Sequence, residues 1–344
     1  MAVVIRNNAS NNRFWDEWAT LFDAVIYDAD AQQNKYDKIT SALTMEKKSN
    51  RWGEKSIVMG GLGDFQAKAE GTNASQDSFS QGYEKFVQHA TFALEVQISK
   101  ELKDDNMLDD AKQKVINMVQ AYKRTRAKLA TAAITGAVGA TETISFNGAE
   151  IDVTTGDGKA LFNEAHNLKG ATSTQCNYFS DVLGSNTVVL NKAANRMRNF
   201  RDDRGEVLGF TADTLIVPGN DPEYEDYVKR VIGSDGEVGS DHNDINTQRG
   251  KWKLVVDPLW TPEISATNHP IIIYSSEALK ALQGVKFYDR TALDIENDVD
   301  VHSRNLTYNG FARMSITFPN WRHAMMIGAA ASSTSVSDAE PFSG

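Results

Sequence analysis

The residues that could act as a nucleophile are few and lie in a polar stretch of the chain. The single cysteine, Cys176, follows His166 by ten residues, and a cysteine beside a histidine is one arrangement that activates a thiol for covalent catalysis. No neighbouring feature of the sequence lowers the pKa of this thiol, so the favoured interpretation is a structural cysteine. One cysteine also excludes an intrachain disulfide.

Metal and nucleotide motifs are absent from the sequence. The six histidines follow no metal-ligand spacing. The segment GGLGDF (60–65) lacks the third glycine of a dinucleotide-binding fingerprint. The acidic segment 234–244 does not have the spacing of a calcium loop and is interpreted as a solvated loop; its acids are Asp235, Glu237, Asp241 and Asp244. We therefore expect no catalytic, cofactor-binding or metal-binding residues.

The composition is that of a globular chain with a sizeable core and an acidic surface. The 344 residues are 41% hydrophobic and 24% charged, with a net charge of −10. This balance does not support a general nucleic-acid-binding surface. No apolar run approaches 18 residues and the start lacks a signal-peptide core, so we expect no membrane span and a cytosol-like compartment.

A long helix is the element around which the chain is organised. From Lys103 to about Thr135, apolar residues recur at gaps of three and four, interrupted by Arg126. Acids crowd its start and Gly136 can end it. About 30 residues would span roughly 45 Å. The single narrow stripe predicts a strut across a sheet, while the plainer alternative is a long helix of any α+β protein.

An aromatic helix is predicted near the N-terminus. Within RFWDEWATLFDAV, large apolar side chains fall at helical spacing: Phe14, Trp15, Trp18, Leu21, Phe22 and Val25. Two alternatives are left open, namely that this face packs on the chain's own core or that it docks on a neighbouring subunit.

Residues 55–99 are predicted to form a long two-stranded excursion. Alternation at Phe65–Ala69 and again at Phe86–Ile98 indicates strands. The segment between them, residues 71–82, is rich in Gly, Ser and Asn and indicates a mobile tip. Because a lone hairpin is only marginally stable in water, another subunit is a good candidate for its support.

The rest of the chain alternates between β and α/β patterns. Residues 142–158 predict a hairpin turning at Asn147-Gly148, and residues 186–295 an α/β region. Residues 296–328 predict two strands joined by a turn at Asn309-Gly310, and 332–344 a disordered tail.

The order of these elements resembles a known family. Arm, long hairpin, long helix, inserted α/β region and closing strands are similar to a tailed-bacteriophage major capsid protein of the Mu-like major head subunit family, which has the Hong Kong phage-type fold. Three segments carry the resemblance: GDGKALFNEAHNLKG, the run from TLIVPGNDPEYEDYVKRVIGS to KWKLVVDPLW, and GFARMSITFPNWRHAMMIGAA.

The resemblance implies an α+β fold and a set of regions. These are an N-terminal arm (1–54), an extended loop (55–101), a peripheral domain (102–159 and 296–330), an axial domain (160–295) and a disordered tail (331–344). It also implies contacts between subunits through the arm and the extended loop, which we assign to Phe14, Trp15, Trp18, Lys68, Phe79 and Tyr83.

The implied function is structural, without an enzyme activity or a cofactor. Hexamers and pentamers of this chain would form an icosahedral head shell, assembled in the host cytoplasm, that encloses double-stranded DNA without reading its sequence. A separate scaffolding protein, a portal and decoration proteins are the expected partners, since no long scaffolding segment precedes the arm. Neither Lys68 nor any asparagine matches the crosslinking motif of some relatives, so self-crosslinking is not expected. The alternatives are a nanocompartment shell with enzyme cargo and a soluble enzyme with an unrecognised site.

Overall fold

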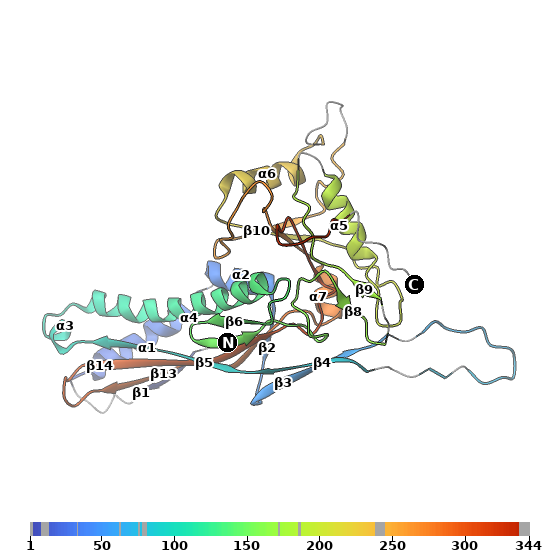
Figure 1. Cartoon of the computed structure of the whole chain (residues 1–344). Coiled ribbons are helices and arrows are strands. Elements are labelled where there is room, and N and C mark those ends of the chain that lie inside the picture. Colours follow the sequence, from blue (N-terminus) through green and yellow to red (C-terminus); the bar gives the residue numbers. More distant parts are fainter. Residues whose placement is uncertain are drawn as a thin grey trace. The chain divides into compact units, whose positions relative to one another are not determined.

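The computed structural model describes residues 3–7, 14–32, 34–61, 63–74, 76–77, 81–170, 173–184, 187–237 and 245–336. The chain divides into two compact units. The first comprises 1–54, 87–130 and 287–316, and the second comprises 55–86, 131–286 and 317–344. Both units combine helices with sheet (Figure 1), which confirms the α+β class.

The first unit is built on a five-stranded sheet with the order β1-β13-β14-β5, to which β2 is added beside β13. Its strands are β1 (Val4–Asn7), β2 (Met45–Lys48), β5 (Ala90–Ile98), β13 (Lys286–Val299) and β14 (Leu306–Thr317). Its helices are α1 (Asp16–Ala31), α2 (Lys35–Leu43), α3 (Lys100–Asp104) and α4 (Leu108–Gly136), the last of which belongs to this unit as far as residue 130.

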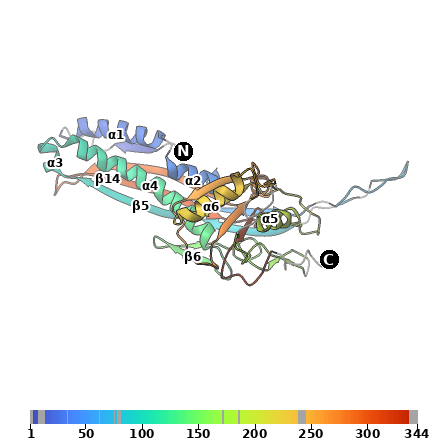
Figure 2. The same cartoon turned by 90° about the horizontal axis from the view of Figure 1, so that it is seen from above.

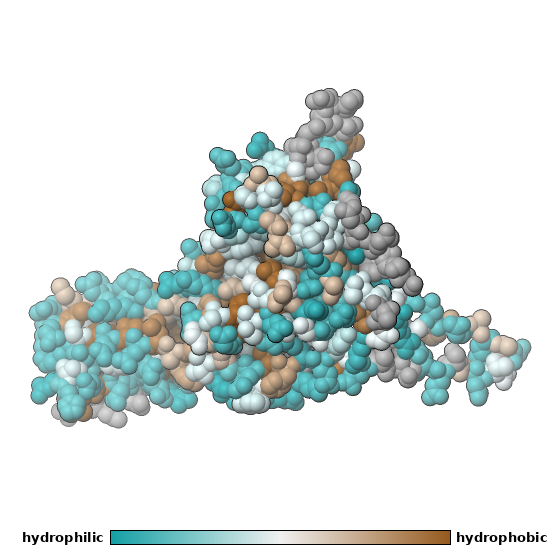
Figure 3. All heavy atoms as spheres, in the orientation of Figure 1, coloured by the Kyte–Doolittle hydropathy of each residue, from teal (hydrophilic) through white to brown (hydrophobic). Residues whose placement is uncertain are grey.

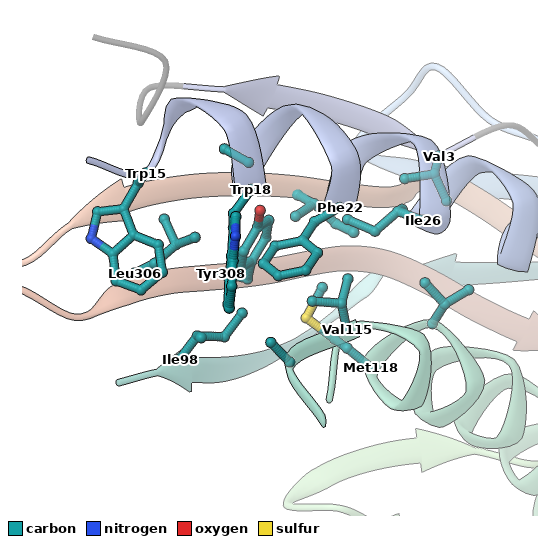
Figure 4. Close-up of a cluster of buried hydrophobic side chains, with 14 of the residues drawn as sticks. Val3, Trp15, Trp18, Phe22, Ile26, Ile98, Val115, Met118, Leu306 and Tyr308 are labelled. Carbon is teal, nitrogen blue, oxygen red and sulfur yellow. The ribbon is translucent and has the colours of Figure 1, made fainter. Parts of the chain in front are cut away.

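Helices α1 and α4 cover the same face of this sheet (Figure 2). Figure 4 shows Phe22 from α1 and Val115 from α4 turned toward the strand residue Tyr308. All three are fully buried within the chain. Each apolar side chain of this size stabilises the fold by roughly 1.5–3 kcal/mol when it leaves water. The apolar stripe of α4 therefore holds the helix along the sheet, as the periodicity predicts.

The long helix begins later than predicted. Residues 100–104 form the separate helix α3, and the chain breaks at Asn106, whose φ is +54°. Asparagine is one of the few residues that adopt this left-handed conformation readily, and it ends a helix in the way that glycine does. The Met107 N–H donates to the Leu102 carbonyl at 2.9 Å, which closes α3 before α4 starts at Leu108.

The predicted turn at Asn309-Gly310 is wrong, because β14 runs straight through it. Asn309 pairs with Glu95 and Gly310 pairs with Leu94 of β5. A Cβ at Gly310 would lie 3.2 Å from a methyl carbon of Leu293, so glycine here permits close packing inside the sheet and not a reversal. The chain reverses instead at residues 300–305, where the Asp300 carboxylate accepts from the backbone of the next residues.

The second unit has a four-stranded sheet at its centre, in the order β11-β10-β12-β15. Its strands are β10 (Thr214–Pro218), β11 (Lys253–Asp257), β12 (Ile271–Tyr274) and β15 (Ala324–Ile327), and its helices are α5 (Val188–Arg198), α6 (Pro222–Gly233) and α7 (Ser276–Ala281). Three two-stranded sheets complete it: β3 (Gly53–Met59) with β4 (Gln81–Gln88), β6 (Thr143–Phe146) with β7 (Ala149–Asp152), and β8 (His166–Asn167) with β9 (Thr174–Gln175).

Two details of this unit bear on the predictions. The β6–β7 hairpin turns at Asn147-Gly148, both with positive φ, as predicted. By contrast, β15 pairs with β12, so residues 296–330 do not all join one sheet.

The chain after Ala331 is held in place as far as the structure describes it, which corrects the predicted disorder for residues 332–336. The Ser332 hydroxyl donates to Glu164 at 2.8 Å and Val336 is 7% exposed. Residues 337–344 lie outside the described part. Within the described residues, no helix is long and apolar enough to cross a membrane.

Candidate assembly surface

The segment between β3 and β4, residues 60–80, is called the excursion here, and its described residues 63–74 project from the second unit (Figure 1). The predicted strand at Phe65–Ala69 is not formed. The strand that pairs with β4 is β3, which ends at Met59, six residues before Phe65. Phe65 is 107% exposed, and every described residue from Gly63 to Asn73 is exposed. Figure 3 shows the excursion as mostly hydrophilic. These residues contribute little to the subunit's own core.

The base of the excursion is closely packed. A Cβ at Gly82 would lie 2.5 Å from the Val58 carbonyl oxygen, so no larger residue fits where β3 and β4 meet. The Lys85 side chain is 9% exposed, and its ammonium donates at 2.5 Å to both the Asp152 carboxylate and the Thr154 hydroxyl. These contacts tie β4 to the β6–β7 hairpin, so the excursion leaves from a fixed base.

A turn at residues 202–204 also holds the base of the excursion, through Asp77 near its returning end. The Arg204 guanidinium donates two hydrogen bonds to the Asp77 carboxylate, at 2.7 and 3.0 Å. Asp77 also accepts from the Gly63 N–H at 2.8 Å, which joins the outgoing and returning chain. Deeper in, Arg322 pairs with Asp203 at 2.7 Å, with side chains 7% and 6% exposed. The exposed pair contributes little because solvent screens it, whereas breaking the buried pair would cost about 3–5 kcal/mol.

The aromatic face of α1 lies mainly inside the first unit. Trp15 and Trp18 are 1% and 7% exposed, and the Trp15 Nε1–H donates to the Arg304 carbonyl at 3.2 Å. Trp18 makes an edge-to-face contact with Phe22 at 5.7 Å between ring centroids. Of the two alternatives for this face, burial of the tryptophans supports packing on the chain's own core. Phe14 is 39% exposed, and its contact with a neighbouring subunit stays a prediction.

The cysteine and histidine singled out for chemistry are both structural in their environments. The Cys176 thiol donates to the Tyr178 carbonyl at 3.2 Å, and burial raises its pKa to about 11, which keeps it protonated. His166 is completely buried, stacks on Trp321 with ring centroids 4.3 Å apart, and lies 2.8 Å from Asp157. Burial lowers the pKa of His166, although the hydrogen bond with Asp157 opposes this. A buried, fully packed imidazole has no room for a substrate.

The residues predicted to contact other subunits are not all brought together. Lys68 is exposed on the excursion, while Tyr83 is half-buried at its base, where the Lys169 ammonium lies 5.8 Å from its ring. Phe79 lies outside the described residues. No motif in the sequence points to the 202–204 turn or to Lys85, since their partners are 67 or more positions away along the chain. Among the described residues, no cluster of acids, histidines and cysteines could hold a metal ion.

A protein-family model described as phage capsid protein matches residues 82–325. Among solved structures, the chain is similar to the capsid of a native GTA particle, with 11% identity, a TM-score of 0.53 and coverage of 88% of this chain and 92% of that one. The capsid of an empty GTA particle has 13% identity, a TM-score of 0.51 and the same coverage. A structure from Mycobacterium phage Adephagia has 14% identity, a TM-score of 0.51 and again 88% and 92% coverage. No curated protein sequence matches the chain.

Proposed function

The chain belongs to the phage capsid protein family, and we propose that it assembles as hexamers and pentamers into a closed icosahedral head that encloses double-stranded DNA. It is a structural subunit of a phage shell and a component of the virion, and its working contacts are with copies of itself. The enzyme and cargo-compartment alternatives are not favoured by this family membership.

The excursion carries the proposal. It is anchored by buried and ionic contacts at its base and then leaves the unit with its side chains in solvent, Phe65 above all. An ordered base with an exposed projecting segment is what a contact between subunits needs, because the segment can reach a neighbour without unfolding its own unit. Slightly different neighbours around fivefold and sixfold axes favour such a movable contact over a rigid plug.

The finer assignments of this function follow the family plan. The first unit would serve as the peripheral domain with α4 as its spine, and the sheet of β10–β12 as the core of the axial domain. Lys68, Tyr83, Phe79 and Phe14 are the proposed contacts with neighbouring subunits. A separate scaffolding protein, a portal and decoration proteins would complete the head in the host cytoplasm.

Replacing residues 65–73 by a short Gly-Ser linker tests the proposal. Because each of these residues is exposed, we expect the free energy of unfolding to change by less than about 0.5 kcal/mol. Closed shells should be lost, as measured by sedimentation and negative-stain microscopy of protein expressed with its neighbouring genes. Asp77 and Gly63 remain, so the base of the excursion is preserved.

A single-site pair serves as the matched control. Phe65→Ser should reduce the yield of closed shells, whereas Phe65→Leu, which keeps an apolar side chain of similar size, should retain it. Normal shells from the linker variant would refute the role of the excursion. A wild-type protein that stays monomeric under all assembly conditions would refute the shell itself.

A further inference from the structure

One exposed face of α4 carries cations that have no acidic partner. Between Asp110 and the end of the helix at Gly136 the chain contains no Asp or Glu. This is unusual in a chain with 46 acidic and 36 basic residues. The helix has six cations in that stretch: Lys112, Lys114, Lys123, Arg124, Arg126 and Lys128.

Three of these six cations are already used within the first unit. Lys112 lies 3.5 Å from Asp109, Lys123 pairs with Asp37 at 3.2 Å, and Arg126 pairs with Asp289 at 2.8 Å. The other three, called the basic stripe here, are Lys114, Arg124 and Lys128. All three are exposed, and none forms an ion pair with any described residue.

The three cations of the stripe share one side of the helix. At 3.6 residues per turn, Lys114, Arg124 and Lys128 fall within about 80° of the helix circumference. Their separations along the axis are about 15 Å and about 6 Å, at 1.5 Å per residue. The polar residues Asn117 and Gln113 lie on the same side and are also exposed.

The helix macrodipole does not account for this pattern. Its effect is confined to the last turn of a helix, and the last turn of α4 contains no basic residue. Lys114 is the seventh residue of the helix, beyond the first turn, so the dipole does not explain it either. The stripe therefore has no evident role in stabilising α4 itself.

We propose that the basic stripe contacts the phosphate backbone of duplex DNA without reading its sequence. This inference rests on the proposed function, which places DNA inside the shell. A duplex carries one phosphate per about 1.7 Å of its axis, and its backbones are separated by grooves about 6 Å and about 12 Å wide, so long Lys and Arg side chains at these spacings can reach phosphates. Asn and Gln side chains also donate to phosphate oxygens.

An acidic protein partner fits the stripe less well. The cores of protein interfaces are enriched in aromatic residues and Met and are depleted in Lys. The stripe has two lysines and polar neighbours, and α4 itself carries no exposed aromatic side chain. At physiological salt the Debye length is about 8 Å, so acids farther from the stripe are screened from a phosphate that touches it. Asp110, one turn before Lys114 on the same side of α4, lies within that distance and opposes the contact at Lys114. Three contacts per subunit would hold DNA weakly.

The test uses the full chain with a fluorescein-labelled 30-base-pair duplex, followed by anisotropy between 50 and 200 mM NaCl. If all three cations meet phosphates, the logarithm of the association constant should fall against log salt with a slope of about −2.7. The variant K114Q/R124Q/K128Q should bind at least tenfold more weakly at 50 mM NaCl, and its slope should be close to zero.

Two control variants distinguish a specific contact of the stripe with DNA from an effect of net charge and from misfolding. K159Q/K251Q/K280Q removes three exposed lysines of the second unit and the same net charge, and should bind DNA as the wild type does. K114R/R124K/K128R keeps the charges and should also bind. Equal affinities for the stripe variant and the second-unit control would overturn the inference, as would a wild-type chain that binds polyglutamate but not the duplex.

Shell formation is scored in the same preparations. If the stripe variant forms closed shells and binds DNA with unchanged affinity, the proposed contact between the basic stripe and DNA is wrong, and the proposed shell function is unaffected. A failure of the wild type to form shells would count against the proposed function, whatever its DNA affinity.

Discussion

Arg126 interrupts the apolar stripe of α4, and its replacement by Met is expected to destabilise the subunit by about 3–5 kcal/mol. Its guanidinium lies 2.8 Å from the Asp289 carboxylate and 3.2 Å from Glu46, and the side chains of Arg126 and Asp289 are 10% and 7% exposed. Methionine fills similar space without charge. The loss therefore comes from leaving the Asp289 carboxylate buried without a cation, and one of its oxygens has no hydrogen-bond partner even in the intact protein.

The pH dependence separates this cause from a packing defect. Burial raises the pKa of Asp289, while the coulombic attraction of Arg126 opposes the rise. Without Arg126 the pKa of Asp289 should rise further. A carboxyl group with a raised folded-state pKa destabilises the fold as pH rises through and above its unfolded value of about 3.9. The destabilisation by Arg126→Met should therefore be smaller at pH 5 than at pH 7, and R126M/D289N should lose this pH dependence.

Urea unfolding of the unassembled subunit, followed by tryptophan fluorescence at pH 5 and pH 7, measures these free energies of unfolding. Arg124→Met removes the same charge from an exposed position two residues away and should change the free energy by less than about 0.5 kcal/mol. The reasoning is refuted if Arg126→Met costs less than 1 kcal/mol at pH 7, or if its cost is the same at both pH values.

Two further substitutions test the cores of the two units. Phe22→Ala should lower the free energy of unfolding in urea by about 3–5 kcal/mol, because Phe22 is fully buried between Trp18 and Tyr308. A loss below about 1 kcal/mol would mean that α1 is not part of the folded core. Burial lowers the pKa of His323 to about 4. The contribution of the neutral imidazole to the free energy of unfolding is therefore complete above the unfolded-state pKa of about 6.5 and declines as pH falls from 6.5 toward 4. His323→Gln should therefore flatten the loss of stability over that pH window, and an unchanged pH profile would exclude His323 as its source.

Local patterns in the sequence predicted the elements whose periodicity is strong. The spacing of Val115, Val119 and Ala133 placed the buried side of α4 correctly. Pro222 and the acids that follow it placed the start of α6, where the Asp221 carboxylate accepts from the Glu223 N–H at 3.1 Å. The start of α6 depends on hydrogen bonds within the helix, and the buried side of α4 depends on the residues of one helix face. Residues that are close in the sequence are therefore sufficient to predict both features.

The errors arose where distant residues decide the local structure. Asn309-Gly310 has the composition of a turn, but Leu293 and the neighbouring strand β5 require a residue without a side chain at Gly310. The polar segment at Ser332 looks disordered in isolation, and it is the Glu164 carboxylate, 168 positions away, that fixes it. The base of the excursion likewise depends on Arg204 and Asp77, which no motif connects. Composition alone could not place any of these contacts.

The stability of the subunit and the availability of its surfaces are carried by different residues, and this separation follows from the requirements of assembly. A side chain such as Phe22 that stabilises the fold is buried and cannot meet a neighbour, while a side chain such as Phe65 that can meet a neighbour is exposed and contributes little to the fold. The same division holds for charge along α4: Arg126 is buried in an ion pair, and Arg124, two residues earlier, is exposed without one. Substitutions at Phe65 or Arg124 should therefore change assembly or binding without changing unfolding, and substitutions at Phe22 or Arg126 should change unfolding first. A variant of Phe65 that unfolds more readily, or one of Phe22 that assembles poorly while remaining fully stable, would contradict this division.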